Sequence, residues 1–389
     1  MPVINSIAAM EEELTAWRRD FHMHPELAFQ ETRTAGIVAE KLRSWGIEVK
    51  EGVGKTGVVG VIKGAGDGPS IGLRADMDAL PIVEANDVAW KSQNDGVMHA
   101  CGHDGHTTML LGAAKYLAET RNFAGTVNVI FQPAEEGYAG AQAMIDDGLF
   151  EEFPCDQVYG LHNWPQMPAG TVAAVPGPIM AAADKFDIKV RGKGAHGAMP
   201  HHGVDPIVIG SQIVTALQSL VSRSKDPIQT AVISVTMFHA GAAFNVIPDE
   251  AVLSGTVRTF RGDVQDRIEA GMKAISEGIA KGMGGSAEVD YRRGYPATVN
   301  HERETELAAG VAVGVVGAEN VRRDVEPTMG AEDFAFMLNQ KPGCYLWLGQ
   351  GGGPSKDNVH HPSYDFNDAV LPIGASVLAR IVEDLQPKR

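Results

Sequence analysis

The densest group of residues that could carry chemistry lies at 98–106, where the sequence reads MHACGHDGH. Cys101 and His103 stand two residues apart in a glycine-containing segment, so a thiolate and an imidazole can face one ion. Cysteine together with histidine favours zinc or a similar borderline metal. The alternative interpretation is a helix N-terminus in which Asp104 and Thr107 are caps and the histidines are exposed to solvent.

Two adjacent carboxylates, Glu135 and Glu136, follow an apolar strand pattern in the run QPAEEG at 132–137. Active sites of α/β proteins lie at the C-terminal ends of such strands. Because adjacent side chains point in different directions, one carboxylate can bind metal while the other is a general base towards a water molecule. Two exposed loop acids are the alternative interpretation.

Two further histidines occupy comparable places. His162 follows a third strand pattern at 156–161, and His360 lies in the run VHHP at 359–362. Taken alone, a histidine in the place of His162 is more often structural than a ligand. Four separate segments that bring Cys, His, Glu and His to strand ends nevertheless predict an open site for two metal ions, with one carboxylate left as the base.

These residues lie between segments that read as alternating strands and helices. Strands are predicted at 58–62, 71–74, 127–131 and 158–161, and helices at 34–44, 107–119 and 141–146. The layout predicts an α/β domain with a central mixed sheet flanked by helices. The run at 52–57 fits the dinucleotide pattern GxGxxG, but a strand pattern follows it where a helix is needed, so it predicts a hairpin turn.

A second unit is predicted at 183–293. Its patterns follow the order βαββαβ, with amphipathic helices at 205–222 and 264–281 between the strands. This order matches the ferredoxin-like sandwich. We therefore expect a catalytic domain formed by 1–182 and 294–389, interrupted by this insertion.

Composition restricts the partners and the compartment. The 389 residues include 33 Lys and Arg against 49 Asp and Glu, a formal net charge of −16, which argues against nucleic acid and anionic membranes as partners. Three cysteines are a sparse, odd set that favours a reducing compartment. Since no signal-peptide pattern opens the chain and no apolar run approaches the roughly 18 residues of a membrane span, we expect a cytoplasmic protein.

Ordered motifs run along nearly the whole chain. They are FHMHPELAF at 21–29, LRADMDALP at 73–81, HACGHDGH at 99–106, QPAEEG at 132–137, GLHN at 160–163, GAHGAMPH at 194–201, FNVIPD at 244–249, MGAEDF at 329–334 and HHPSYDFN at 360–367. Together they resemble the M20 metallopeptidase and amidohydrolase group. The similarity is to the branch of hippurate hydrolases, N-acyl-L-amino-acid amidohydrolases and plant auxin-conjugate hydrolases.

The resemblance implies two divalent metal ions, Zn²⁺ or Mn²⁺, with Co²⁺ and Ni²⁺ as alternatives. The ligands that it implies are Cys101, His103, Glu136, His162 and His360, with Cys101 as the bridging ligand. The family usually has His-Asn-Pro or His-Ser-Pro at this point, which aligns with His360-His361-Pro362 and favours His360, with His361 as the alternative.

The same resemblance implies roles for two acids beside the metals. Glu135 is expected to be the general base. Asp76 is expected to orient a ligand or the base, with a loop cap after a strand as its alternative role.

The resemblance also implies roles for the insertion at 183–293. It is expected to be a lid and dimerisation unit in a homodimer, in which His196 reaches a neighbouring active site and donates to the developing oxyanion or to the substrate. Asn245 and Arg258 are expected to hold the substrate's carboxylate, since arginine can bind a carboxylate through two hydrogen bonds. A monomer with a closing lid, and a solvated Arg258, are the alternatives.

The predicted function is metal-dependent hydrolysis of the amide bond of a small N-acyl amino acid, which releases a carboxylic acid and a free amino acid. A dipeptidase or aminoacylase of the same clan would use the same residues on a different substrate. A protein that binds metal or amino-acid conjugates without catalysis is the alternative from another class, and Glu135 argues against it.

Overall fold

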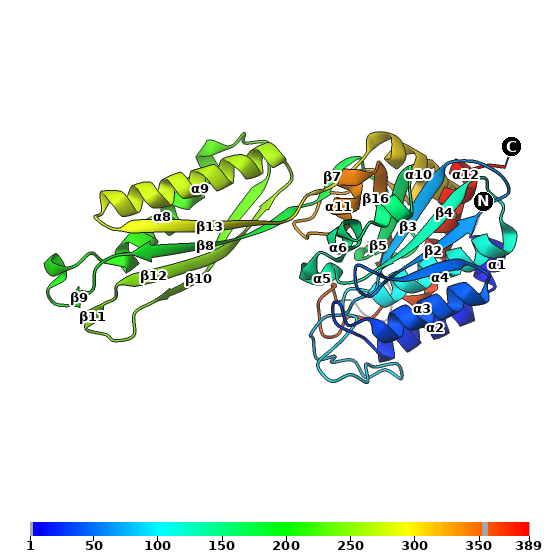
Figure 1. The fold of residues 1–389 in the computed structure, drawn as a ribbon, viewed down its shortest axis with the longest axis horizontal. Helices are drawn as coiled ribbons and strands as arrows, with labels where there is room; N and C mark the ends of the chain where they lie inside the picture. The colour runs from blue at the N-terminus through cyan, green and yellow to red at the C-terminus, as the bar shows by residue number, and fades with distance from the viewer. Residues whose placement is uncertain (1–2, 352–356, 389) are drawn as a thin grey trace. The chain divides into compact units, whose positions relative to one another are not determined.

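The computed structural model describes residues 3–351 and 357–388. The chain divides into two compact units, each of which can be followed in Figure 1. The first consists of Met1–Gly177, Val299–Glu326 and Asp333–Arg389, and the second of Pro178–Thr298 and Pro327–Glu332. The insertion expected at 183–293 lies inside the second unit.

The first unit is built on an eight-stranded sheet. In spatial order its strands are β1 (Glu48–Val53), β2 (Gly57–Lys63), β4 (Thr126–Gln132), β3 (Ser70–Asp76), β5 (Gln157–Pro168), β16 (Gly343–Gly351), β6 (Val172–Ala173) and β15 (Val321–Arg322). The neighbours β4, β3, β5 and β16 run parallel, whereas β2 is antiparallel to both β1 and β4. This mixed sheet confirms the predicted fold class, and the β1–β2 turn confirms the hairpin at 52–57.

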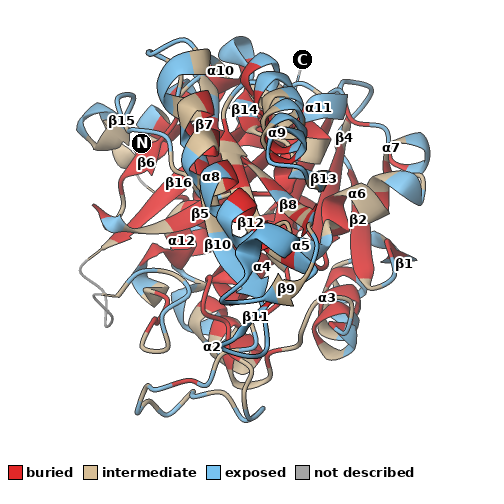
Figure 2. Ribbon diagram, turned by 90° about the vertical axis from the view of Figure 1, so that its left-hand side faces the viewer, coloured by how far each residue is buried: buried red, intermediate tan, exposed pale blue. Residues whose placement is uncertain are grey.

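Helices cover both faces of this sheet. They are α1 (Asn5–Ala8), α2 (Glu11–Met23), α3 (Thr32–Ser44), α4 (His103–Thr120), α5 (Glu135–Tyr138), α6 (Gly140–Asp146), α7 (Leu149–Glu152), α10 (Glu302–Val316), α11 (Phe334–Gln340) and α12 (Leu371–Leu385). Short 3₁₀ turns lie at Ala318–Asn320 and Asp368–Val370. In Figure 2 the strands β2, β5 and β16 are mostly buried, as expected for strands that helices cover.

Alternation along β3 separates the core from the site. Leu73 is fully buried in the apolar core that also contains residues of α4 and α12. Its neighbour Arg74 points to the opposite face, because successive side chains of a strand alternate. There the guanidinium lies 5.7 Å from the ring centroid of Phe334 in α11. The predicted strand at 71–74 therefore has one apolar face and one polar face.

The second unit confirms the order βαββαβ. Its main elements are β8 (Ala182–Arg191), α8 (Pro206–Ser219), β10 (Ala231–Ala240), β12 (Glu250–Thr259), α9 (Gly262–Gly282) and β13 (Ser286–Tyr295). The sheet order is β10-β12-β8-β13 with antiparallel neighbours, and Phe186, Ile213 and Ile268 lie in the core between sheet and helices. The helix α8 begins where expected because the Asp205 side chain accepts a hydrogen bond from the N–H of Ile207 at 2.8 Å.

Smaller elements complete the fold. They are β7 (Gly177–Met180), β9 (Ala195–His196), a 3₁₀ turn at Pro200–His202, a π-helical turn at Leu220–Ser224, β11 (Val246–Ile247) and β14 (Thr298–Asn300). None of the helices within 3–351 and 357–388 combines the length and the apolar character that a bilayer crossing needs.

Candidate metal centre

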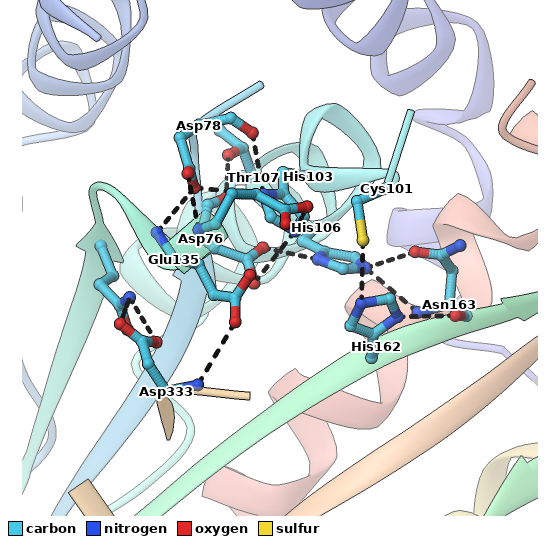
Figure 3. Close-up of polar contacts among 12 residues, drawn as sticks. Asp76, Asp78, Cys101, His103, His106, Thr107, Glu135, His162, Asn163 and Asp333 are labelled. Carbon is cyan, nitrogen blue, oxygen red and sulfur yellow. Dashed lines mark hydrogen bonds and ion pairs between the residues drawn. The ribbon is translucent and has the colours of Figure 1, made fainter. Parts of the chain in front are cut away.

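Three neighbouring parallel strands of the first unit bring the predicted site residues together towards their C-terminal ends. Asp76 is the last residue of β3, Glu135 follows β4, and His162 lies in β5 (Figure 3). Cys101 precedes α4, whose first residue is His103. The helix begins four residues earlier than predicted, since Gly102 adopts the left-handed conformation (φ 92°) that turns the chain into it.

The five predicted ligands lie together. Cys101, His103 and His162 form one group, and Cys101, Glu136 and His360 form another, with the ligand atoms of each group within 4.8 Å of one another. Cys101 belongs to both groups, which is the placement that a bridging thiolate requires. A third group joins His103 with Glu135 and Glu136, so the predicted base lies beside the predicted ligands.

Hydrogen bonds identify the free nitrogen of two histidines. Nδ1 of His103 lies 2.8 Å from the carbonyl oxygen of Asp78, and Nδ1 of His162 lies 2.7 Å from the carbonyl oxygen of Asn163. A carbonyl can only accept, so Nδ1 carries a proton, and in the neutral ring that binds a metal ion Nε2 holds the lone pair. The Nε2 atom of His162 lies 3.5 Å from Sγ of Cys101. The tautomers are thus those of two imidazole ligands.

Two buried atoms of this cluster lack hydrogen bonds among the described residues. They are Nε2 of His103 and Oε1 of Glu136, of which the latter has an ion-pair contact with Nε2 of His360 at 3.2 Å. Buried polar atoms without partners are uncommon in native proteins and call for an ion, a ligand or water. Sulfur, nitrogen and carboxylate oxygen are together the donors that borderline divalent ions prefer. The residues present therefore fit a divalent metal centre.

His360, not His361, belongs to the cluster. Nε2 of His360 lies 3.2 Å from Oε1 of Glu136, whereas Nδ1 of His361 lies 3.4 Å from a carboxylate oxygen of Asp357. The N–H of His360 donates to the carbonyl oxygen of Ala100 at 2.7 Å, which ties this segment to the one that carries Cys101. Its φ of 67° is unusual for a residue with a Cβ, as is common where a fold constrains a functional residue.

Without a metal ion, the carboxylates give this cluster an excess of negative charge. Burial, followed by the nearby Glu136 and Glu135 carboxylates, raises the pKa of the Cys101 thiol well above its usual value. Burial opposes a charge on His103, yet Asp76 and Asp78 outweigh it and raise the pKa of that imidazole to about 10. A divalent cation would neutralise the charges that cause both shifts.

Asp76 lies next to the ligands and contacts a histidine that is not one of them. Its Oδ1 atom lies 2.6 Å from Nδ1 of His106, and Nε2 of His106 lies 2.6 Å from Oδ1 of Asn163. Since both ring nitrogens have partners, His106 holds two site segments together. Burial disfavours a charge on Asp76, but Arg74, His103 and His106 hold the pKa of this carboxyl well below its usual range. The alternative role of Asp76, a loop cap, does not describe this buried contact.

Asp78 contacts the residues of the candidate site and was not singled out by the motif analysis. Its carboxylate accepts hydrogen bonds from the backbone N–H groups of Glu135 at 3.0 Å and Glu136 at 2.9 Å, and its carbonyl oxygen orients His103. The available signal was its spacing, two residues from Asp76 in the run LRADMD, which places both acids on the same face of the chain.

Two alternative interpretations of the sequence are wrong. His103 and His106 are each only 1% exposed, so they are not solvated, and Thr107 donates its hydroxyl to the carbonyl oxygen of Asp76 instead of capping α4. Glu135 is 6% exposed, which excludes a solvated loop acid.

The remaining predicted residues belong to the second unit. His196 pairs with Val246 across the two-stranded ribbon of β9 and β11, and the N–H of Gly197 donates to the carbonyl oxygen of Asn245 at 2.7 Å. The segments of His196 and Asn245 thus lie side by side, and both side chains are exposed. Arg258 lies in β12 and is half-buried, and its Nη1 donates to the carbonyl oxygen of Val257 at 3.1 Å. It is therefore not the fully solvated strand residue of the alternative.

Known proteins resemble the chain over nearly its full length. Residues 72–384 match the model of peptidase family M20/M25/M40. A hippurate hydrolase of Campylobacter jejuni is 43% identical and covers 98% of each chain, and an N-acetylcysteine deacetylase of Bacillus subtilis is 40% identical over 96% of this chain and 97% of its own. A Bacillus subtilis structure described as a dinuclear metal binding peptidase of the M20 family matches with a TM-score of 0.86, 36% identity, and coverage of 97% and 99%.

Proposed function

Because the chain belongs to peptidase family M20, we propose that it is a metal-dependent amidohydrolase that cleaves the amide bond of small N-acyl amino acids. The names of the hippurate hydrolase and the N-acetylcysteine deacetylase support this substrate class. The products would be a carboxylic acid and a free amino acid.

The metal centre would hold two divalent ions through Cys101, His103, Glu136, His162 and His360. Zn²⁺ or Mn²⁺ suits this set of donors, with Co²⁺ and Ni²⁺ as alternatives. When bound, the ions would polarise the scissile carbonyl and make the attacking water more acidic. Asp76 and Asp78 would keep the histidines and the adjoining loop in place.

Glu135 would move the proton. Its Oε1 atom accepts a hydrogen bond from the backbone N–H of Asp333 at 3.3 Å, which restrains the carboxylate without protonating it. The carboxylate would take one proton from water as the hydroxide oxygen bonds to the carbonyl carbon, and would then give that proton to the nitrogen as the C–N bond breaks. One water molecule is consumed, and its atoms are divided between the acid and the amine.

The observation that carries this proposal is that two adjacent carboxylates belong to different groups of possible metal ligands. Glu136 shares a ligand group with Cys101 and His360, whereas Glu135 lies in the same cluster but belongs to neither group that contains Cys101. We expect Glu135→Gln to keep its metal ions and to lose about 10²–10⁴-fold in kcat, the range of general acid–base catalysis. The matched control, Glu136→Gln, should lose metal as well as activity.

A panel of substrates completes the test. Benzoyl, acetyl and indole-acetyl amino acids, with dipeptides for comparison, would be offered to the apo-protein reloaded with each metal. Turnover of acyl amino acids by wild type, and its loss in Glu135→Gln at full metal content, would support the proposal. Equal turnover in that variant, or turnover of dipeptides alone, would contradict it.

The second unit enters the proposal as a dimerisation and lid unit. The strand β10 lies at the edge of its sheet and exposes Met237 and Phe238 at 50% and 38%, and α8 exposes Ile207 and Val208 at 39% and 47%. An unpaired edge with apolar side chains favours pairing with a second copy of the chain. We propose a homodimer that pairs through this unit.

Shared active sites extend this part of the proposal. His196 of one chain would donate to the oxyanion formed in the other, while Asn245 and Arg258 hold the substrate's carboxylate. Mixing the inactive variants His196→Ala and Glu135→Gln should restore activity, because exchanged dimers would contain one intact site. No recovery despite demonstrated subunit exchange would contradict the role of His196.

The three unpaired, buried cysteines support a cytoplasmic location, which is part of the same proposal.

A further inference from the structure

Three successive backbone N–H groups of the loop after β4 donate to buried carboxylates from elsewhere in the chain. The N–H of Ala134 donates to Oε1 of Glu31 at 2.9 Å, and the N–H groups of Glu135 and Glu136 donate to Asp78. Acids from elsewhere in the chain therefore orient the segment 134–136, which carries both carboxylates of the candidate site and begins the short helix α5. Asp78 belongs to the site already described, whereas Glu31 lies in the connection between α2 and α3.

The peptide that Glu31 holds has an unfavourable backbone conformation. Ala134 adopts φ 55° and ψ 42°, in the left-handed region. For a residue with a Cβ this conformation is sterically unfavourable. It persists where surrounding contacts determine it, and such residues gather at functional sites. Ala134 directly precedes Glu135, so its conformation sets the direction in which Glu135 leaves the strand.

Glu31 is built into the fold as a fixed acceptor. Its side chain is fully buried. Besides Ala134, its carboxylate accepts from the N–H of Phe29 at 3.0 Å and from the hydroxyl of Thr56 at 2.5 Å. Phe29 and Thr56 lie on opposite sides of Glu31 in the chain, the latter in the turn between β1 and β2. The carboxylate therefore links its own connection and the β1–β2 turn to the peptide of Ala134.

We propose that Glu31 is a positioning residue for Glu135, which holds Ala134 in the left-handed conformation and so directs the base into the metal centre. Glu31 touches no reacting atom. The inference rests on the proposed function for the identity of the base, but it also predicts a metal-binding effect that needs no substrate, because Glu136 lies on the same loop.

The first two variants test whether the site needs the hydrogen-bond acceptor of Glu31 or its negative charge. Glu31→Ala removes the acceptor, and we expect kcat to fall about 10–100-fold, as for other residues that orient metal-site groups, while KM stays within about twofold. The affinity for the divalent ion should fall about 10-fold through Glu136. Glu31→Gln should retain most of the activity, because its amide oxygen can accept from both N–H groups and its amide nitrogen can donate to Thr56.

A second substitution tests the mechanism. Glycine adopts the left-handed conformation without a steric penalty, so Ala134→Gly should no longer depend on Glu31. The double variant Glu31→Ala/Ala134→Gly should recover most of the kcat and of the metal affinity that Glu31→Ala loses. Ala134→Gly alone should resemble wild type in both measurements.

The chain offers a matched control in Glu26. This carboxylate lies in the same connection and accepts from the N–H groups of Arg33 at 2.9 Å and Thr34 at 2.8 Å and from the hydroxyl of Thr32 at 3.3 Å, all at the start of α3. We expect Glu26→Ala to lower the melting temperature about as much as Glu31→Ala does, with kcat and metal affinity unchanged.

The measurements distinguish failure of the proposed function from failure of the role of Glu31. Lack of turnover of N-acyl amino acids by wild type would refute the proposed function, while the metal-affinity series would still test Glu31. Unchanged kcat and metal affinity in Glu31→Ala, failure of the double variant to recover, or an equal loss of kcat in Glu26→Ala would each refute the role of Glu31. If Glu31→Ala does not fold, Glu31→Leu in the Ala134→Gly background provides the same comparison through metal affinity.

Discussion

Arg74 and Asp76 form a buried ion pair at the end of β3, with Nη1 2.7 Å from Oδ2. Residues two apart in a strand share a face, so the pair needs no turn to form. Arg74 also donates to Oδ1 of Asp333 at 3.0 Å. The guanidinium therefore compensates two buried acids beside the metal centre and keeps Asp76 charged for its contact with His106.

Removal of this buried cation should destabilise the protein strongly. Arg74→Met leaves two acids without their countercharge, and we expect the free energy of unfolding to fall by about 3–5 kcal/mol. Urea denaturation of metal-free protein measures the change. Arg43→Met breaks an ion pair with Glu51 whose side chains are 52% and 45% exposed, and it should cost at most about 1 kcal/mol. Equal losses in the two variants would contradict this account.

His22 gives the fold a defined dependence on pH. Burial opposes its charge, but hydrogen bonds to Asp104 at 2.8 Å and Glu84 at 3.2 Å outweigh burial and raise its pKa to about 9. Because this folded-state pKa lies above the unfolded value of about 6.5, charged His22 stabilises the fold fully below about pH 6.5, by about 3 kcal/mol. This contribution is lost as the pH rises through about 9.

The measurement is the difference in unfolding free energy between wild type and His22→Gln at pH 6, 8 and 10. It should be largest at pH 6 and small at pH 10. His24→Gln, at the end of the same helix, is the control, since the partly exposed His24 ring contacts only Asp20, its carbonyl oxygen at 2.8 Å and its carboxylate at 3.4 Å, among the described residues. A difference that grows with pH would contradict the assignment.

His360 and His361 form a natural pair of variants, because both side chains are 53% exposed. We expect His360→Ala to weaken binding of one divalent ion by at least about 10–100-fold. His361→Ala should bind two ions with unchanged affinity. Metal content by mass spectrometry after dialysis, together with calorimetric titration, distinguishes the two. The converse result would transfer the ligand role to His361.

Metal removal should lower stability through the predicted bridging ligand. A divalent ion at about 100 times its Kd should add about 2.7 kcal/mol per site to the unfolding free energy, so a chelator should lower the melting temperature. Cys101→Ala should lose most of this metal-dependent gain. Cys155→Ala removes another buried cysteine, outside the site, and should keep it. The same gain in both variants would show that Cys101 is not a ligand.

The spacing of apolar residues predicted the helices and strands that are long enough to show a repeating pattern. The helices at 34–44 and 264–281 are found at Thr32–Ser44 and Gly262–Gly282. The strands β6 and β15 were not predicted, because two residues carry no alternation. The order of strands in the large sheet was not predicted either, since it depends on packing between distant segments.

The candidate ligand residues could be identified in the sequence because metal chemistry restricts the residue types. Cys101, His103 and His162 are of the few types that bind borderline ions, and they adjoin recognisable strand or helix patterns. The groups that orient them could not be found in this way. Asp78 and Glu31 act through backbone N–H groups, which every residue except proline has, so their partners leave no pattern in the sequence.

The hydrogen bond from His360 to the carbonyl of Ala100 joins segments that the ribosome makes at very different times. Cys101, His103, Glu136 and His162 are all synthesised before residue 163, and His360 follows about two hundred residues later. A nascent chain therefore carries four of the five predicted ligands without the last one. Capture of metal by all five proposed ligands would therefore require that the segment of His360 has been made and has docked beside Ala100.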